Sequence, residues 1–397
     1  HLARGAAANA LVLVAANFRA VFTFLIARLL GEAGLGRFTL VFATVDLISK
    51  VGILGLDVAV VPLLVKREAT GDRDGSRRLF VRAVVAGLGV STLLAMVGLP
   101  VLVWIAGRYH LEGFSRGGTI MLLALPGIAV ARIATGTSRA LMSMRSELYS
   151  RGLVETWMTT GVFVIAVGLG LRDTAPSLAV VAGSTGGAIV AFALATRALE
   201  APRRGVARPG PAPSGGALPT MVEMLRFSLP IAGSSLLSSL SLSVDVLLLG
   251  AFVGRAPGVT LESFGVFCAA AEVAGGLRKV RQVFDPIFVP VAATRHASGL
   301  RGDLRDTVAS PGRWVLAGQL PLVGVLVLAS GAVLSIYGPG FRSGALWLAV
   351  LALAHAANSF TGLIDALLVI ERPWLGLINA IVTVSTQLLA GLILIPL

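Results

Sequence analysis

The chain has 397 residues, of which 56% are hydrophobic and only 13% carry a charged side chain. Soluble domains average about 45–50% apolar and about 25% charged residues, so this composition excludes an ordinary soluble protein and predicts an all-α, polytopic membrane protein. The net charge of +13 would suit a nucleic-acid partner. Most Arg residues, however, lie in short segments between apolar runs and form no basic face with interleaved aromatic residues, so no nucleic-acid binding is expected.

Apolar windows of about 20 residues, the length needed to cross a bilayer, predict the membrane spans. In chain order we expect eleven, at residues 6–30, 37–65, 80–106, 118–143, 153–171, 175–198, 224–253, 262–290, 313–337, 344–370 and 374–396. The chain starts at His1 and stops at "LILIPL", so we expect a truncated C-terminus. We find no separate signal peptide, because the first apolar run is too long.

Between the sixth and seventh spans lies "EAPRRGVARPGPAPSGGALPT", which is too rich in Pro, Gly and Arg to form a packed element. We therefore predict an N-terminal transmembrane lobe at 1–199, a linker at 200–221 and an incomplete C-terminal transmembrane lobe at 222–397. An internal repeat favours two lobes related by pseudo-symmetry: residues 57–71 resemble residues 285–299, and residues 135–141 resemble residues 361–367 at nearly the same offset. Transporters usually bind substrate in the cleft between such lobes.

The distribution of Lys and Arg predicts the orientation in the membrane. Far more of them lie in segments after even-numbered spans than in segments after odd-numbered spans. Cytoplasmic loops carry the excess of cations, so we expect a cytoplasmic N-terminus and a cytoplasmic linker.

The eighth predicted span contains three cations near its middle, Arg278, Lys279 and Arg281. One charge at a helix centre costs roughly 2.5–3.5 kcal/mol on insertion scales, so these side chains must face something other than lipid. Glu272 and Asp285 neutralise only part of that charge, which leaves a cationic site suited to an anion, and Arg holds phosphate with two parallel hydrogen bonds. We expect Lys279 to contribute less and to pair with Glu272.

Other spans carry polar residues on one face at helical spacing, and we expect these faces to meet in one cavity. Asp46, Asp57 and Asp365 are the candidates for binding or releasing a coupling H⁺ or Na⁺, because a buried carboxylate must change its charge state for an ion gradient to drive transport. The remaining candidates are Arg19 in span 1, Lys50 in span 2, Arg132 and Arg139 in span 4, and His355 and Asn358 in span 10.

Each polar face also has a structural interpretation. Asp46 and Lys50 could neutralise each other as a pair one helical turn apart. The cations of span 4 could extend to the membrane interface, the polar residues of span 10 could be satisfied by packing, and Asp245 in span 7 could pair with an Arg. No metal site is expected, since the single Cys268 and the four His residues are scattered, and no cofactor motif is found.

Four stretches carry a resemblance to a known family: "ARLLGEAGLGRFTLVFATVDLISKVGILGLDVAVV", "FSLPIAGSSLLSSLSLSVDVLLLGAFVG", "YGPGF" and "IERPWLGLINAIVT" with the ending "LLAGLILIP". The sequence resembles the oligosaccharide flippase and polysaccharide exporter branch of the multidrug/oligosaccharidyl-lipid/polysaccharide (MOP) superfamily. The resemblance covers essentially the whole chain. It implies two six-helix lobes around a central cavity.

The resemblance also implies a function. Members of this branch move a polyprenyl-pyrophosphate-linked oligosaccharide across the bacterial inner membrane by alternating access, for surface polysaccharide synthesis, in contact with membrane lipid and with polymerase or export machinery. Related lipid II flippases carry Arg residues in spans 1 and 8, and the matching positions here are Arg19 and Arg278 or Arg281. The acidic residues Asp46, Glu272 and Asp285 depart from a purely cationic cavity.

Two other functions compete with this one. A drug or cation antiporter of the same superfamily would need an acidic cavity, and the cations of span 8 disfavour it. A membrane-embedded sugar polymerase or glycosyltransferase would need a large loop with catalytic carboxylates or metal ligands, and no predicted loop is long enough. We therefore expect a transporter and not an enzyme.

Overall fold

The computed structural model describes residues 2–69, 71–109, 112–141, 143, 145–201, 220–297, 302–371 and 373–396. Within these ranges it describes all side chains except those of 2–19, 69, 103–109, 112–115, 145, 281–297, 302–312, 314, 360–371, 373, 376 and 377. All regular structure in the described residues is helical.

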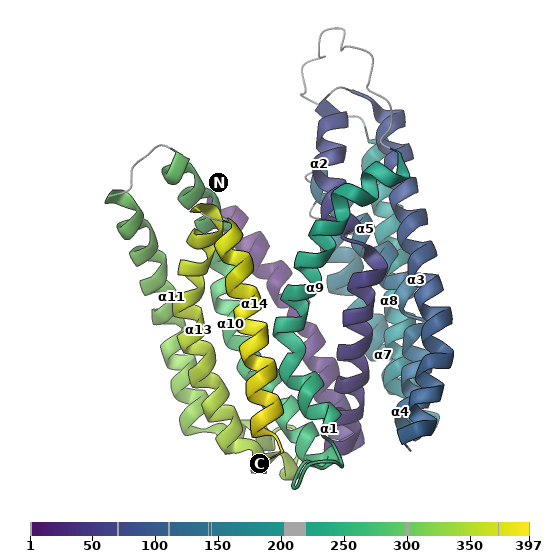
Figure 1. The fold of residues 1–397 in the computed structure, drawn as a ribbon, viewed down its shortest axis with the longest axis vertical. Helices are drawn as coiled ribbons and strands as arrows, with labels where there is room; N and C mark the ends of the chain where they lie inside the picture. Colours follow the sequence, from purple (N-terminus) through teal and green to yellow (C-terminus); the bar gives the residue numbers. More distant parts are fainter. Residues whose placement is uncertain are drawn as a thin grey trace. The chain divides into compact units, whose positions relative to one another are not determined.

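The helices follow one another along the chain in the order shown in Figure 1. Each of the eleven predicted spans coincides with one helix or with two consecutive ones. Six stretches of the described residues are long and apolar enough to cross a membrane, and Val315–Leu328 and Ile378–Leu394 are shorter apolar helices. The predicted all-α, polytopic membrane fold is confirmed. The helices are α1 Leu2–Ile53, α2 Leu56–Ala69, α3 Arg73–Tyr109, α4 Glu112–Leu122, α5 Leu125–Ala140, α6 Arg145–Glu147, η1 Leu148–Glu155, α7 Thr156–Gly168, α8 Ala175–Glu200, α9 Met221–Ala251, α10 Leu261–Ala297, α11 Gly302–Leu328, α12 Ser330–Ser335, η2 Pro339–Gly344, α13 Ala345–Glu371 and α14 Pro373–Leu394.

Two glycines with positive φ break the helix in this region, Gly31 between the first two predicted spans and Gly55 within the second. Gly31 has φ 72°, a conformation that side chains disfavour, and it kinks α1 between its two halves. Gly55 has φ 69° and separates α1 from α2. A Cβ on Gly55 would lie 2.7 Å from the Ser228 carbonyl oxygen, so the absence of a side chain also lets the α1–α2 turn approach α9.

The chain divides into two compact units. One unit contains residues 1–39 and 243–397, and the other contains residues 40–242. Helices α1 and α9 each contribute to both units, so this division groups the chain differently from the predicted lobes. The lobe boundaries at 199 and 222 stay a prediction, and most of the linker, residues 202–219, lies outside the described residues.

In the unit of residues 40–242, α5 packs against α2, α3 and α8, and α7 packs against α8. Its core joins residues from α1, α2, α3, α5, α8 and α9, and the Phe80 and Phe192 rings stack with their centroids 5.4 Å apart. Small residues set the helix separation. A Cβ on Gly136 of α5 would overlap the backbone carbonyl of Asp57 on α2, so only glycine permits this approach.

In the unit of residues 1–39 and 243–397, α13 packs against α10, α11 and α14. Gln319 of α11 is 1% exposed, and its amide nitrogen donates hydrogen bonds to the Leu277 carbonyl oxygen at 2.7 Å and to Ser359 Oγ at 2.8 Å. One side chain thus connects α11 to both α10 and α13. It fixes the backbone of α10 one residue before Arg278.

Gly136→Ala is expected to destabilise the protein by roughly 1–3 kcal/mol, the usual cost of overpacking, because the new methyl group meets a backbone carbonyl that cannot move aside. Thermal unfolding of the purified protein measures this loss. Gly161→Ala is the matched control, since nothing lies within 4 Å of a Cβ at that position of α7. Equal unfolding temperatures for the Gly136 variant and the wild type would show that the α2–α5 contact is looser than described.

Candidate functional site

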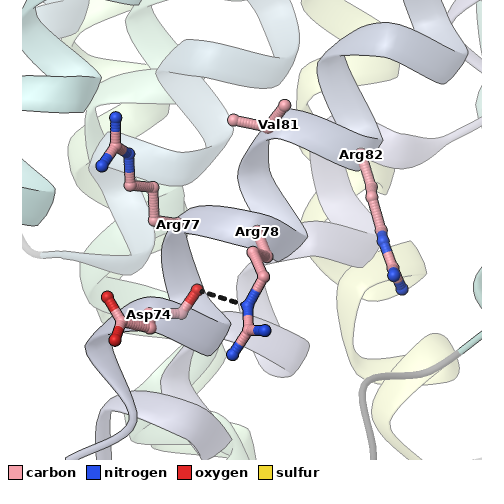
Figure 2. Close-up of a pocket in the computed structure, with 5 residues that line it drawn as sticks. All are labelled: Asp74, Arg77, Arg78, Val81 and Arg82. Carbon is pink, nitrogen blue, oxygen red and sulfur yellow. Dashed lines mark hydrogen bonds between the residues drawn. The ribbon is translucent and has the colours of Figure 1, made fainter.

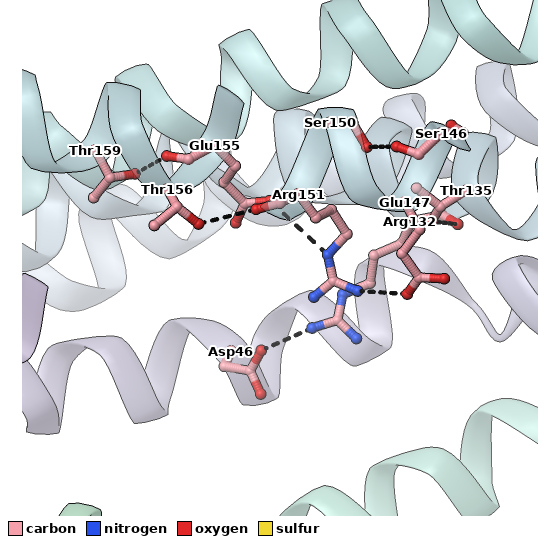
Figure 3. A network of polar contacts seen from close by, with 10 residues as sticks. All are labelled: Asp46, Arg132, Thr135, Ser146, Glu147, Ser150, Arg151, Glu155, Thr156 and Thr159. Carbon is pink, nitrogen blue, oxygen red and sulfur yellow. Dashed lines mark hydrogen bonds and ion pairs between the residues drawn. The ribbon is translucent and has the colours of Figure 1, made fainter. Parts of the chain in front are cut away.

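The unit of residues 40–242 contains a network of charged side chains centred on Asp46 of α1 (Figure 3). Arg132 of α5 donates from Nη2 to Asp46 Oδ1 at 3.3 Å, and Lys50 Nζ lies 3.8 Å from Asp46 Oδ2. The three side chains are 14–29% exposed. Partial burial weakens solvent screening, so the carboxylate holds both cations in place.

A π-helical turn supplies the second part of the network. Residues 148–155 form a π-helix, an arrangement often found at functional sites. It places Arg151 between two carboxylates, with Nη1 3.8 Å from Glu147 Oε1 and Nε 3.9 Å from Glu155 Oε2. In Figure 3 the Arg151 side chain extends toward Arg132.

The network contains four carboxylates and three cations, so carboxylates are available for all of its cations. Arg132 is repelled by Arg151 and attracted by Asp46, Asp57 and Glu155. Lys50 interacts with the same Asp46 and Asp57. The network is therefore locally compensated and needs no external anion to offset its cations. This geometry corresponds to the structural interpretation of Asp46 and Lys50, with Arg132 added as a second partner.

The unit of residues 1–39 and 243–397 gathers charges around Arg278 of α10. Arg278 interacts electrostatically with Asp245 of α9 and with His355 of α13. The guanidinium folds back along its own helix, where its Nη2 lies 3.2 Å from the place that a Cβ on Gly275 would occupy. Gly275 therefore makes room for the Arg278 side chain.

The other sequence candidates lie around these two groups. Lys279 is half-buried beside Arg278 and has a partner of its own, and Glu272 is exposed about two turns earlier on α10. Asn358 is exposed one turn after His355. Arg139 is exposed in the last turn of α5.

Three candidates lie where side chains are not described. Arg19 is on α1, Arg281 on α10 and Asp365 on α13. Their roles stay predictions. The backbone does place residue 19 in the compact unit that contains α10, whereas the sequence predicted that it belongs to the other lobe.

Sequence reasoning missed Glu147, Arg151 and Glu155. Their spacing of four residues was a usable signal, because alternating charges at that interval form ion pairs along a helix. The segment lay at the edge of an apolar window and was treated as a loop. Among the residues whose side chains are described, no group of three or more His, Cys, Asp or Glu could hold a metal ion.

The comparison with known families decides what kind of protein this is. The model of the polysaccharide biosynthesis protein family matches residues 2–277, more than half of the chain. The chain belongs to this family. The search of curated proteins finds no match.

Solved structures show the fold of this family member. The chain is similar to an inward-facing multidrug resistance MATE family transporter of the MOP superfamily, with TM-score 0.78 and 15% identity over 94% of this chain and 84% of the other. The outward-facing conformation of such a transporter matches with TM-score 0.54 and 14% identity over 97% and 93%. A MOP superfamily transporter from Pyrococcus furiosus, described as having a binding pocket of reverse polarity, matches with TM-score 0.56 and 13% identity over 97% and 94%.

These matches confirm the resemblance seen in the sequence. Family and fold are those of MOP-superfamily transporters and not of enzymes. The protein is therefore a polytopic membrane transporter. Sequence identities of 13–15% show only that the fold is shared, so the proposed substrate rests on the side chains of this chain.

Proposed function

We propose that this protein is a flippase that moves a polyprenyl-pyrophosphate-linked oligosaccharide from the cytoplasmic to the outer leaflet of the bacterial inner membrane by alternating access. The observation that carries the proposal is the partly buried cation Arg278 on α10, a helix that packs against α11 and α13, in a member of the polysaccharide biosynthesis family. A guanidinium inside a membrane domain needs an anionic partner, and a pyrophosphate matches its fork of donors.

The charge balance around Arg278 supports an anionic substrate. Arg278 interacts electrostatically with the carboxylate of Asp245, and a second cation, Lys279, follows it directly on α10. Arg281 follows one turn later on α10, and Arg19 belongs to the same compact unit. In this proposal Arg19, Arg278 and Arg281 bind the pyrophosphate, and the polyprenyl chain stays in lipid.

The rival function is a drug or cation antiporter, favoured by the fold of the MATE structures. Its substrate is a lipophilic cation, which would need uncompensated carboxylates. In the described part of the chain three carboxylates of the residue 40–242 network form ion pairs: Asp46 with Lys50 and Arg132, and Glu147 and Glu155 with Arg151. Pairing of this kind disfavours the antiporter.

Coupling to an ion gradient follows from the same network. Asp46, Asp57 and Asp365 stay the candidates for binding the coupling ion. For Asp46 the structure offers a way to couple protonation to a conformational change, because protonating its carboxylate would release Lys50 and Arg132 from their shared partner. Asn at the coupling position should preserve substrate binding and abolish the dependence of transport on the gradient. If the wild type flips its substrate at the same rate with and without H⁺ and Na⁺ gradients, the proposal of ion coupling is wrong.

The proposed orientation is open to cysteine labelling. In a Cys268→Ser background, Arg204→Cys in the linker should react only with reagents that enter the cytoplasm, and Ser343→Cys in η2 should react from outside. The reason is the excess of Lys and Arg in the segments assigned to the cytoplasm. Labelling of the linker variant by an impermeant external reagent would reverse the assigned topology.

Complementation in cells tests the proposed substrate class. Expression in a strain that lacks its oligosaccharide flippase should restore surface polysaccharide, and expression in a drug-sensitive strain without efflux pumps should leave sensitivity to cationic drugs unchanged. Membrane abundance is measured in both strains. Drug resistance without polysaccharide would favour the antiporter over the flippase.

A further inference from the structure

The first turns of α3 carry a basic pocket that the proposed transport does not use. Described residues that line this pocket of about 580 Å³ are Asp74, Arg77, Arg78, Val81 and Arg82 (Figure 2). In Figure 2 the Arg78 and Arg82 side chains extend to the same side of the helix, as expected for residues one turn apart. The lining has three guanidinium groups against one carboxylate.

Local hydrogen bonds fix Asp72 and Arg78 beside the pocket. Asp72, two residues before Asp74, is held elsewhere: its Oδ2 accepts from Arg67 at 2.6 Å and its Oδ1 accepts from the Gly75 backbone N–H at 2.8 Å. Arg78 Nε donates to the Asp74 carbonyl oxygen at 3.2 Å, which fixes the start of its side chain. The remaining donors of the Arg78 guanidinium are directed outward from the helix (Figure 2).

An apolar stripe continues directly from the pocket along α3. Val81, Val85 and Leu88 follow Arg78 at intervals of three, four and three residues and are 43%, 59% and 41% exposed. These positions share one face of the helix. Residues 73–102 are long and apolar enough to span the membrane, so this exposed stripe suits acyl chains.

We propose that the α3 pocket binds the phosphate headgroup of an anionic phospholipid, whose acyl chains lie along Val81, Val85 and Leu88. Arg78 and Arg82 are the principal ligands, because guanidinium forks match phosphate oxygens. Cations in a loop would be enough to orient the protein in the membrane. Here the cations line a pocket that continues into an apolar stripe, and this combination fits a lipid with a charged headgroup and apolar chains. The site is separate from the proposed substrate site at Arg278 and does not depend on the transported substrate.

Lipid retention tests the site without any transport assay. The full chain is purified into phosphatidylcholine nanodiscs containing graded phosphatidylglycerol, and bound lipids are counted by native mass spectrometry. A cation near an anionic surface contributes about a fivefold change in binding, so Arg78→Gln/Arg82→Gln should bind phosphatidylglycerol about 30-fold more weakly than the wild type. Arg78→Lys/Arg82→Lys should keep part of the binding, because charge remains without the fork.

The matched control is Arg73→Gln, which removes one cation from the same end of α3 but lies outside the pocket lining. It should retain the lipid as the wild type does. Equal loss in the Arg73 variant would mean that general charge, and not the pocket, attracts the lipid. Displacement of the lipid by equal concentrations of glycerol phosphate would mean a soluble-anion site. Either result, or undiminished binding by the double Gln variant, overturns the proposal.

Discussion

Arg278→Gln is expected to weaken binding of a polyprenyl pyrophosphate by about 10- to 150-fold, because a hydrogen bond to a charged group contributes roughly 1.5–3 kcal/mol. Gln removes the charge and the fork, and its polar end lies two bonds closer to the backbone. Titration of the purified protein with polyprenyl pyrophosphate, followed by quenching of an attached fluorophore, measures the affinity. Arg278→Lys should recover part of it, since the charge returns without the second parallel hydrogen bond.

The neighbouring Lys279 provides the matched control on the same helix. Lys279→Gln removes the same charge one position along α10, about 100° around the helix, and should weaken binding far less. Unaltered affinity in the Arg278 variant, with normal amounts of folded protein, would make this Arg a structural partner of Asp245. Similar losses in both variants would point to the overall charge of the segment.

Asp46→Ala is expected to lower the free energy of unfolding by up to roughly 3–5 kcal/mol, the range for removing one partner of a buried ion pair. The variant leaves Lys50 and Arg132 facing each other without the carboxylate that now lies 3.8 Å and 3.3 Å from them. Partial exposure of the three side chains places the expected loss toward the lower end of that range. Thermal unfolding in detergent gives the measurement.

A second substitution separates the loss of the attraction to Asp46 from the repulsion that remains between Lys50 and Arg132. Asp46→Ala/Arg132→Met should recover much of the lost stability, because a hydrophobic side chain of similar length replaces the orphaned cation. Glu147→Gln is the matched single change and should cost at most about 1 kcal/mol, since Glu155 still pairs with Arg151 and these side chains are more exposed. An Asp46 variant as stable as the Glu147 variant would contradict the central place of Asp46.

The helices could be predicted because the bilayer fixes their length and composition. Every apolar window found in the sequence is helical in the described residues, since backbone groups in lipid must be satisfied within a helix. The breaks were not predicted. Leu54–Gly55 adopts positive φ within one predicted span, and the turn depends on the approach of α9, a contact remote in the sequence. The sequence likewise did not predict that α1 and α9 are each divided between the two compact units.

The candidate site was predicted only in part, because it too depends on which helices pack together. Charges inside spans stand out, so Asp46, Lys50, Arg132, Arg278 and His355 could be singled out from the sequence. Helical spacing says which of them share a face but not which helices meet. The structure joins Arg132 to Asp46 across two helices and brings Arg278 near His355. Arg151 was not singled out because it lies between two predicted spans, which end at residue 143 and begin at residue 153.

Flipping in proteoliposomes tests the central claim most directly. The purified protein is reconstituted with a fluorescent polyprenyl-pyrophosphate disaccharide, and a membrane-impermeant quencher reports how much lipid crosses the bilayer. The proposed function predicts that the wild type exposes the inner pool to the quencher, that Arg278→Gln does so much more slowly, and that a cationic dye is not moved. Movement of the dye without movement of the pyrophosphate lipid would contradict it.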